Sequence, residues 1–109
     1  SAALDILSSR GEGDAGIISL KYGDTKYKRE ILSEVQRLCL AAVRAPSGNA
    51  DRESRALLSR WSVPALLAGA EILGGAVRDL KFNAYFPALL YSAMLSMTEE
   101  NNKWQKLSE

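Results

Sequence analysis

The feature that most restricts the fold of this chain is the return of apolar residues at every third or fourth position. In an α-helix this interval places side chains on one face, whereas a half-buried β-strand needs an apolar residue at every second position. The first long segment of this kind follows Asp24, which can cap a first helical turn. Pro46 and Gly48 predict where it ends. Its apolar face is expected to consist of Tyr27, Ile31, Val35, Leu38 and Ala42.

Capping residues and prolines divide the rest of the chain into three more helical segments. The second helix is expected to begin in the region Asn49–Asp51 and to carry Trp61. Ser62 as an N-cap and Pro64 in a first turn predict a break at residues 62–64, because proline cannot continue a helix without a kink. The third helix then extends to about Leu80 with apolar residues at helical spacing.

The fourth helix is expected to start near Asn83, with Pro87 in or near its first turn, where proline is tolerated. Only residues 81–84 connect it to the third helix, so these two helices should be antiparallel neighbours. The longest apolar run, residues 84–97, contains fourteen residues and is interrupted by Pro87. A bilayer span needs about 20, so the chain is not expected to cross a membrane.

The first 23 residues lack a sustained helical pattern. Residues 1–10 are compatible with a short helix capped by Ser1, with Leu4 and Leu7 facing inward, although so short a helix must dock to be stable. The sequence GEGDAG at residues 11–16 is typical of a mobile loop, because it contains three glycines and two acidic residues. Residues 17–22 are expected to be extended or to form a single turn on the core.

These elements predict an all-α fold, an up-and-down four-helix bundle with a loosely packed N-terminal segment. The flexible segment comprises residues 1–23 and the bundle domain residues 24–109. A chain of 109 residues has room for one domain. No stretch alternates polar and β-branched residues, so no sheet is expected.

Composition excludes several kinds of chemistry. The chain has no His and one Cys, so it lacks the residues for Ser–His or Cys–His catalysis, a His-ligated metal or an internal disulfide. Residues 11–16 match the G-x-G-x-x-G pattern of dinucleotide sites, but no strand precedes them, and Glu12 and Asp14 would repel phosphate. A carboxylate pair, Glu71 and Asp79, is the remaining enzyme hypothesis. The expectation is a protein that is not an enzyme, with no catalytic residue, metal, cofactor or small-molecule substrate.

Two groups of side chains are candidates for binding a partner. The basic cluster at the start of the first long helix forms a solvated face or a surface for an acidic partner. Nucleic acid is a weaker reading of it, because fourteen Lys and Arg oppose thirteen Asp and Glu, for a net charge of +1. Aromatic residues gather after the third helix, and exposed aromatic side chains are typical of protein interfaces. The residues expected to bind a partner are Lys26, Lys28, Arg29, Arg37, Phe82 and Tyr85.

Small residues are concentrated between Ala65 and Ala76 in the third helix. Each glycine inside a helix costs about 1 kcal/mol relative to alanine, so this run needs a compensating contact. Close packing against another helix would provide it. The run is therefore an internal packing seam, a docking groove for another chain or a hinge at Gly74–Gly75.

The stretch from Trp61 to Phe86, and above all residues 73–82 (LGGAVRDLKF), resembles the helix that follows a tryptophan in the PsbQ-like extrinsic proteins of photosystem II. Members of this family are soluble four-helix up-and-down bundles behind a flexible N-terminal stretch. The resemblance covers about a quarter of the chain. It implies a non-catalytic subunit in the thylakoid lumen that docks on a membrane complex and supports oxygen evolution.

Three functions follow from these observations. The first is a non-enzymatic accessory subunit of a larger assembly, with a photosystem II extrinsic protein as its most specific form. The alternative is a small helical nucleic-acid-binding factor that uses the basic helix around Lys26–Arg44. The third is an enzyme that uses the carboxylates named above. The residues alone leave the compartment and the partner open.

Overall fold

The described residues form six α-helices and one short 3₁₀-helix, and no strand occurs among them. The structure is a computed structural model, and it describes residues 1–9, 11–45, 51–82 and 84–108. The prediction of an all-α fold is confirmed, but six helices are present where four were expected. The elements are α1 (Ala2–Leu7), α2 (Gly11–Lys21), α3 (Lys28–Arg44), α4 (Arg52–Arg60), α5 (Val63–Asp79), η1 (Leu80–Phe82) and α6 (Phe86–Ser108).

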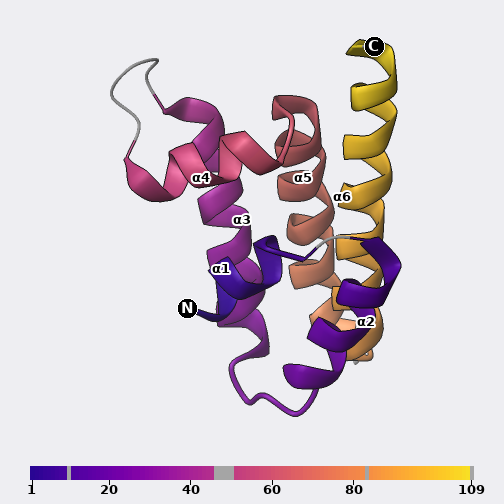
Figure 1. Cartoon of the computed structure of the whole chain (residues 1–109). Coiled ribbons are helices and arrows are strands. Elements are labelled where there is room, and N and C mark those ends of the chain that lie inside the picture. The colour runs from indigo at the N-terminus through magenta and orange to yellow at the C-terminus, as the bar shows by residue number, and fades with distance from the viewer. Residues whose placement is uncertain (10, 46–50, 83, 109) are drawn as a thin grey trace.

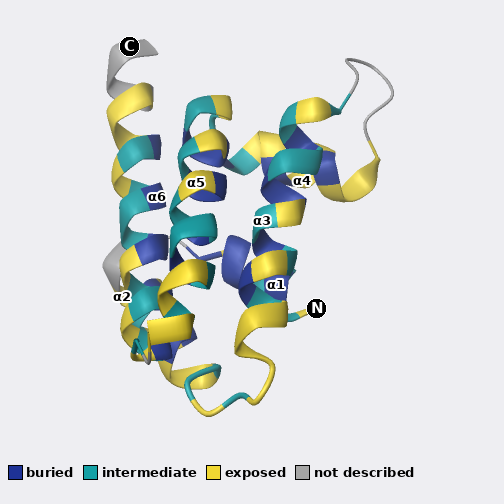
Figure 2. Ribbon diagram, turned by 180° about the vertical axis from the view of Figure 1, so that it is seen from behind, coloured by how far each residue is buried: buried dark blue, intermediate teal, exposed yellow. Residues whose placement is uncertain are grey.

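The long helices α3, α5 and α6 lie side by side, and consecutive ones run in opposite directions (Figure 1). The antiparallel packing expected for the last two helices is therefore confirmed. Helix α1 packs against α3, helix α2 packs against α6, and the two short helices also contact each other. The molecule measures 40 × 27 × 21 Å. Its core lies between the three long helices and the two N-terminal ones (Figure 2).

Helix α4 crosses the end of α3 because the chain turns sharply before α5. The axes of α4 and of the α5–η1 segment differ by 103°. Ser62 is the N-cap of α5, and its hydroxyl accepts a hydrogen bond from the amide of Ala65 at 3.2 Å. Pro64 occupies the first turn, as predicted. Asp51 caps α4 in the same way, since its carboxylate accepts from the amide of Ser54 at 2.7 Å.

Long-range hydrogen bonds hold the α4–α5 corner to the rest of the molecule. The indole Nε1 of the buried Trp61 donates to the carbonyl of Leu7 at the end of α1, at 2.9 Å. From α6, the side-chain oxygen of Asn101 accepts from the backbone amide of Ser62 at 2.8 Å. These bonds satisfy polar groups at a turn that the solvent reaches poorly, and they join α1, α5 and α6.

In the N-terminal segment the structure differs from the sequence prediction. Residues 11–21 form helix α2, where a loop and an extended stretch were expected. The reason is tertiary packing, because Ala15 and Ile18 are buried and α2 lies against α6, which offsets the low helix propensity of its glycines. The cap of α1 is as predicted, since the Ser1 hydroxyl accepts from the amide of Leu4 at 3.2 Å. Leu7 is fully buried and Leu4 is half-buried.

Helix α3 begins four residues later than predicted. Asp24 does not cap it; the preceding turn is instead closed by Thr25, whose hydroxyl accepts from the amide of Tyr27 at 3.1 Å. Tyr27, expected on the apolar face, therefore lies outside the helix and is 57% exposed. At the other end Ala45 is extended, as a residue before proline should be, whereas Pro46 and Gly48 lie outside the described residues. The buried face of α3 consists of Leu32, Val35, Leu38, Cys39 and Ala42.

The small residues of α5 form an internal packing seam. A Cβ atom added to Gly69 would lie 2.6 Å from the end of the Met97 side chain of α6. One added to Gly74 would lie 2.8 Å from the Gln36 side-chain nitrogen of α3. That nitrogen donates to the carbonyl of Ala70 at 2.9 Å. Of the three readings of this run, the structure supports close approach between helices of the same chain.

No single helix in the described ranges is long and apolar enough to cross a membrane. The bent pair formed by α4 and the α5–η1 segment would reach that length and hydropathy only together.

Candidate functional site

Two segments that are far apart in the sequence meet at one end of the molecule, at the bottom of Figure 1. One is the turn from Gly23 into the first turn of α3, and the other is the passage from η1 into α6. They approach closely because Gly23 has no side chain, and a Cβ atom there would lie 3.2 Å from Cγ of Pro87. Between the segments lies an open depression of about 660 Å³. Its walls are Gly23, Asp24, Lys26, Lys28, Arg29, Glu30, Leu80, Ala84, Tyr85, Phe86 and Pro87.

The structure brings four of the six predicted binding residues together in this depression. Lys26, Lys28 and Arg29 stand on one side of it and Tyr85 on the other. Phe82 is 81% exposed at the end of η1 but is not part of its wall. We refer to this part of the molecule as the basic–aromatic end, and it comprises Lys26, Tyr27, Lys28, Arg29, Phe82 and Tyr85.

Arg37 is the predicted binding residue that lies elsewhere. It sits further along α3, where its guanidinium donates two hydrogen bonds to the carboxylate of Glu34, at 2.9 and 2.5 Å. The hydrogen bond from Arg37 lowers the pKa of Glu34. An acidic residue three positions before a basic one on a helix predicts such a pair, so the sequence contained the signal that Arg37 already has a partner.

The cations of the basic–aromatic end differ from Arg37, because they have no carboxylate partner among the described residues. Within the described ranges, neither Lys28 nor Arg29 forms an ion pair, and Lys26 lies over the ring of its neighbour Tyr27, 5.7 Å from the centroid. Two carboxylates, Asp24 and Glu30, also line the depression. The positive charge is therefore modest and local, and it is not neutralised by pairing within this part of the chain.

The aromatic side chains of this end are unusually exposed. Tyr85 is 72% exposed, and it ranks with Phe82 among the most exposed large apolar residues of the described chain. Tyr27 joins them, and sequence analysis missed it because its spacing matched the apolar face of α3. Exposed apolar groups near charged ones are typical of interaction surfaces. The depression can therefore accept an apolar group against Leu80, Tyr85 and Pro87 and an anionic group beside it.

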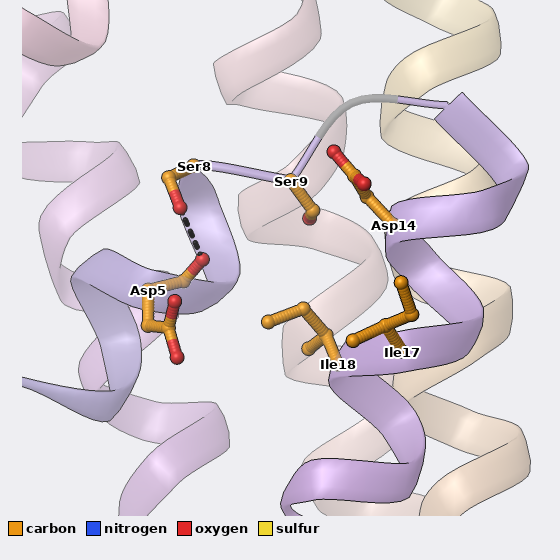
Figure 3. Close-up of a pocket in the computed structure, with 6 residues that line it drawn as sticks. All are labelled: Asp5, Ser8, Ser9, Asp14, Ile17 and Ile18. Carbon is orange, nitrogen blue, oxygen red and sulfur yellow. Dashed lines mark hydrogen bonds between the residues drawn. The ribbon is translucent and has the colours of Figure 1, made fainter.

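A second, smaller depression of about 210 Å³ lies between α1 and α2 (Figure 3). Its polar groups are engaged by the protein itself. The hydroxyl of Ser8 donates to the carbonyl of Asp5 at 2.6 Å, and that of Ser9 to the carbonyl of Ile6 at 2.5 Å. The Asp5 carboxylate accepts from Lys21 Nζ and the Tyr22 hydroxyl, both at 2.6 Å, and these bonds lower its pKa. The hydrogen bonds of Asp5 connect α1 to the end of α2, so we interpret this depression as structural.

The other candidates for chemistry are not assembled into a site. Glu71 and Asp79 are both exposed on α5, eight residues and about 12 Å apart, and neither lines either depression. Burial raises the pKa of the Cys39 thiol to about 12, so it stays protonated at neutral pH. Within the described residues, no three Cys, Asp or Glu side chains are grouped to hold a metal ion. The glycine pattern at residues 11–16 lies in helix α2, with no strand before it.

Comparisons with protein-family models, with curated proteins and with solved structures found no match to this chain. The interpretation of the site therefore depends on its own geometry. That geometry offers apolar contact area and, on the same surface, cations without an ion pair among the described residues, an arrangement suited to binding.

Proposed function

We propose that this chain is a non-enzymatic accessory subunit that docks on a larger protein assembly through its basic–aromatic end. One observation carries the proposal: the exposed ring of Tyr85 and the cations Lys26, Lys28 and Arg29, for which the described residues show no ion pair, line a common depression. Aromatic and arginine side chains supply most of the binding energy in protein interfaces.

In its most specific form, the proposed assembly is photosystem II and the chain is one of its lumenal extrinsic subunits. This form rests on the resemblance of residues 61–86 to the PsbQ-like family. It requires the chain to co-fractionate with oxygen-evolving membranes and to be released from them by high salt, as a subunit held partly by charge should be.

The alternative proposal is a nucleic-acid-binding factor. The placement of Tyr85 across the depression from Lys28 and Arg29 supports it, because single-stranded nucleic acids bind to basic grooves in which bases stack on aromatic rings. The carboxylates of Asp24 and Glu30 in the same wall disfavour it, because they would repel a continuous line of phosphates. Binding to an oligonucleotide that weakens steeply between 50 and 200 mM salt would favour this alternative over protein docking.

The test of protein docking is co-purification from the native source after gentle extraction, with the stoichiometry of the complex measured by light scattering. A complex of defined stoichiometry that is lost in Tyr85→Ala and retained in Leu67→Ala supports the proposal. Leu67 is a suitable control, since it is also a half-exposed apolar residue but lies on α5 outside the depression. A chain that elutes alone from every gentle extract would refute it.

A further inference from the structure

The chemistry of the depression at the basic–aromatic end restricts what the partner can present to it. Its volume of about 660 Å³ lies in the range of 300 to 1,000 Å³ that holds a small ligand or a few side chains. It is open to solvent along one side, so it can receive part of a continuous chain. An extended or helical segment of another protein fits such a shape better than an enclosed small molecule.

The apolar part of the wall favours binding of an apolar group of the partner. Leu80, Tyr85 and Pro87 are among its lining residues, and Tyr85 is mostly exposed. Phe86 also borders it, although its side chain is almost completely buried in the core. A flat bilayer surface would leave the concave wall uncovered, whereas one large apolar side chain would fill it.

The charged part of the wall favours a partner whose carboxylates are separated from one another. Lys26, Lys28 and Arg29 have no ion-pair partner in the described ranges, and Lys26 lies over the ring of Tyr27. The two carboxylates in the wall, Asp24 and Glu30, lie among these cations. A segment with two or three separate acidic side chains brings less negative charge near Asp24 and Glu30 than a uniform polyanion does, so it is repelled less.

We propose that the depression binds a short acidic segment of the partner protein, with one large apolar side chain against Leu80, Tyr85 and Pro87 and its carboxylates beside Lys26, Lys28 and Arg29. The inference rests on the proposed function and narrows it from docking in general to one kind of partner sequence. Contacts of opposite charge would guide the encounter, and the apolar side chain would set the lifetime of the complex.

The test uses the full chain, ¹⁵N-labelled, and three synthetic peptides in NMR titrations. The first peptide, Glu-Glu-Leu-Phe-Glu-Asp, has the proposed chemistry; the second replaces its Leu and Phe with alanine, and the third replaces its acidic residues with lysine. Saturable shifts at residues 24–30 and 80–87 are expected with the first peptide alone. If the first peptide leaves these resonances unchanged, or the lysine peptide binds equally well, the inference is overturned.

Matched variants identify the charges that matter. The double variant Lys28→Glu/Arg29→Glu should weaken binding of the acidic peptide by roughly tenfold or more. The control, Arg52→Glu/Arg55→Glu, makes the same charge change at exposed positions on α4 outside the depression and should leave binding within about twofold. Equal weakening in both pairs would indicate a general charge effect and overturn the inference.

The failure of this inference can be told apart from failure of the proposed function. If a stoichiometric complex from the native source survives the Lys28→Glu/Arg29→Glu change, docking stands and the acidic-segment inference fails. If no complex forms with any version of the chain, the proposed function itself fails. Sedimentation with vesicles of phosphatidylcholine and phosphatidylserine, without any response to the acidic peptide, would assign the surface to lipid and overturn the inference.

Discussion

At the scale of single residues, the two tryptophans differ in what they hold together. Trp61 is buried at the α4–α5 corner and donates its indole hydrogen to the carbonyl of Leu7, 54 positions away. Trp104 is more exposed, and its indole donates to Glu100 one turn back on the same helix. The first contact joins distant parts of the chain, whereas the second stays within α6.

Replacing Trp61 with phenylalanine should therefore destabilise the fold by about 2–4 kcal/mol, because the change leaves a cavity and a carbonyl without its donor. The matched change Trp104→Phe should alter stability by no more than about 0.5 kcal/mol. Urea unfolding followed by far-UV circular dichroism measures both free energies without relying on tryptophan fluorescence. Equal effects of the two substitutions would contradict the role assigned to Trp61.

At the scale of elements, the sequence predicted those helices whose apolar period and end signals agree. Helix α4 begins within the predicted region, with Asp51 as its cap, and α5 begins at the predicted cap Ser62; both side chains accept from an amide three residues on. Helix α2 was missed because its glycines have low helix propensity and its stabilising contacts come from α6. Local pattern cannot show a contact to a helix some seventy residues later in the chain.

The glycines of α5 allow a test of the packing seam. Gly75→Ala should stabilise the protein by about 0.5–1 kcal/mol, because alanine favours the helix and the new Cβ atom would meet only the end of Arg78, at 3.6 Å. Gly69→Ala should destabilise it by about 1–3 kcal/mol, because the buried Met97 has to move. Thermal unfolding of the two variants compares them directly. Stabilisation in both would show that α5 and α6 are not closely packed at Gly69.

The contact of the Asp5 carboxylate in α1 with Lys21 and Tyr22 at the end of α2 should weaken in acid. The hydrogen bonds from Lys21 and Tyr22 keep the pKa of Asp5 below its ordinary value of 3.8. A carboxyl whose pKa is lowered in the folded state stabilises it above its unfolded pKa, and this contribution is lost as the pH falls through the folded pKa.

The stability difference between wild type and Asp5→Asn should therefore be largest above about pH 5 and should shrink towards pH 2. Urea midpoints measured across this range test the prediction, and subtracting the variant removes the contributions of Glu34 and Asp51, whose pKa values are also lowered. A difference that stayed constant with pH would mean that the Asp5 contacts are not formed in solution.

At the scale of the whole molecule, the candidate site shows what a sequence can and cannot reveal. The residue types of the candidate site could be named from the sequence, because clustered cations and aromatics are visible in one dimension. Their assembly could not be predicted, because Lys28 and Tyr85 lie 57 positions apart and come to the same depression through the packing of α3 against α5 and of α5 against α6. Tyr27 was assigned to the core because helical spacing was extended one turn beyond the true start of α3.

The predicted division of the chain into a flexible segment, residues 1–23, and a bundle domain, residues 24–109, concerns the whole molecule and can be tested by truncation. Residues 1–23 contribute Ile6, Leu7, Ala15 and Ile18 to the same core cluster as the long helices, and Leu7 accepts the bond from Trp61. Burial of a large aliphatic side chain contributes about 1.5–3 kcal/mol. Removal of this segment also uncovers the faces of α3 and α6 against which α1 and α2 pack.

The fragment 24–109 should therefore be less stable than the full chain by at least about 3 kcal/mol, from Ile6 and Leu7 alone, and it should bind a hydrophobic dye that the full chain does not. Calorimetry and urea unfolding of the two chains provide the measurement. As a control, adding residues 1–23 as a separate peptide should restore part of the lost stability, because α1 and α2 would dock on the same faces.

A fragment that unfolds at the temperature of the full chain would instead support the flexible, loosely packed segment predicted from the sequence. In that case the basic–aromatic end would be formed by α3, α5, η1 and α6 without help from α2.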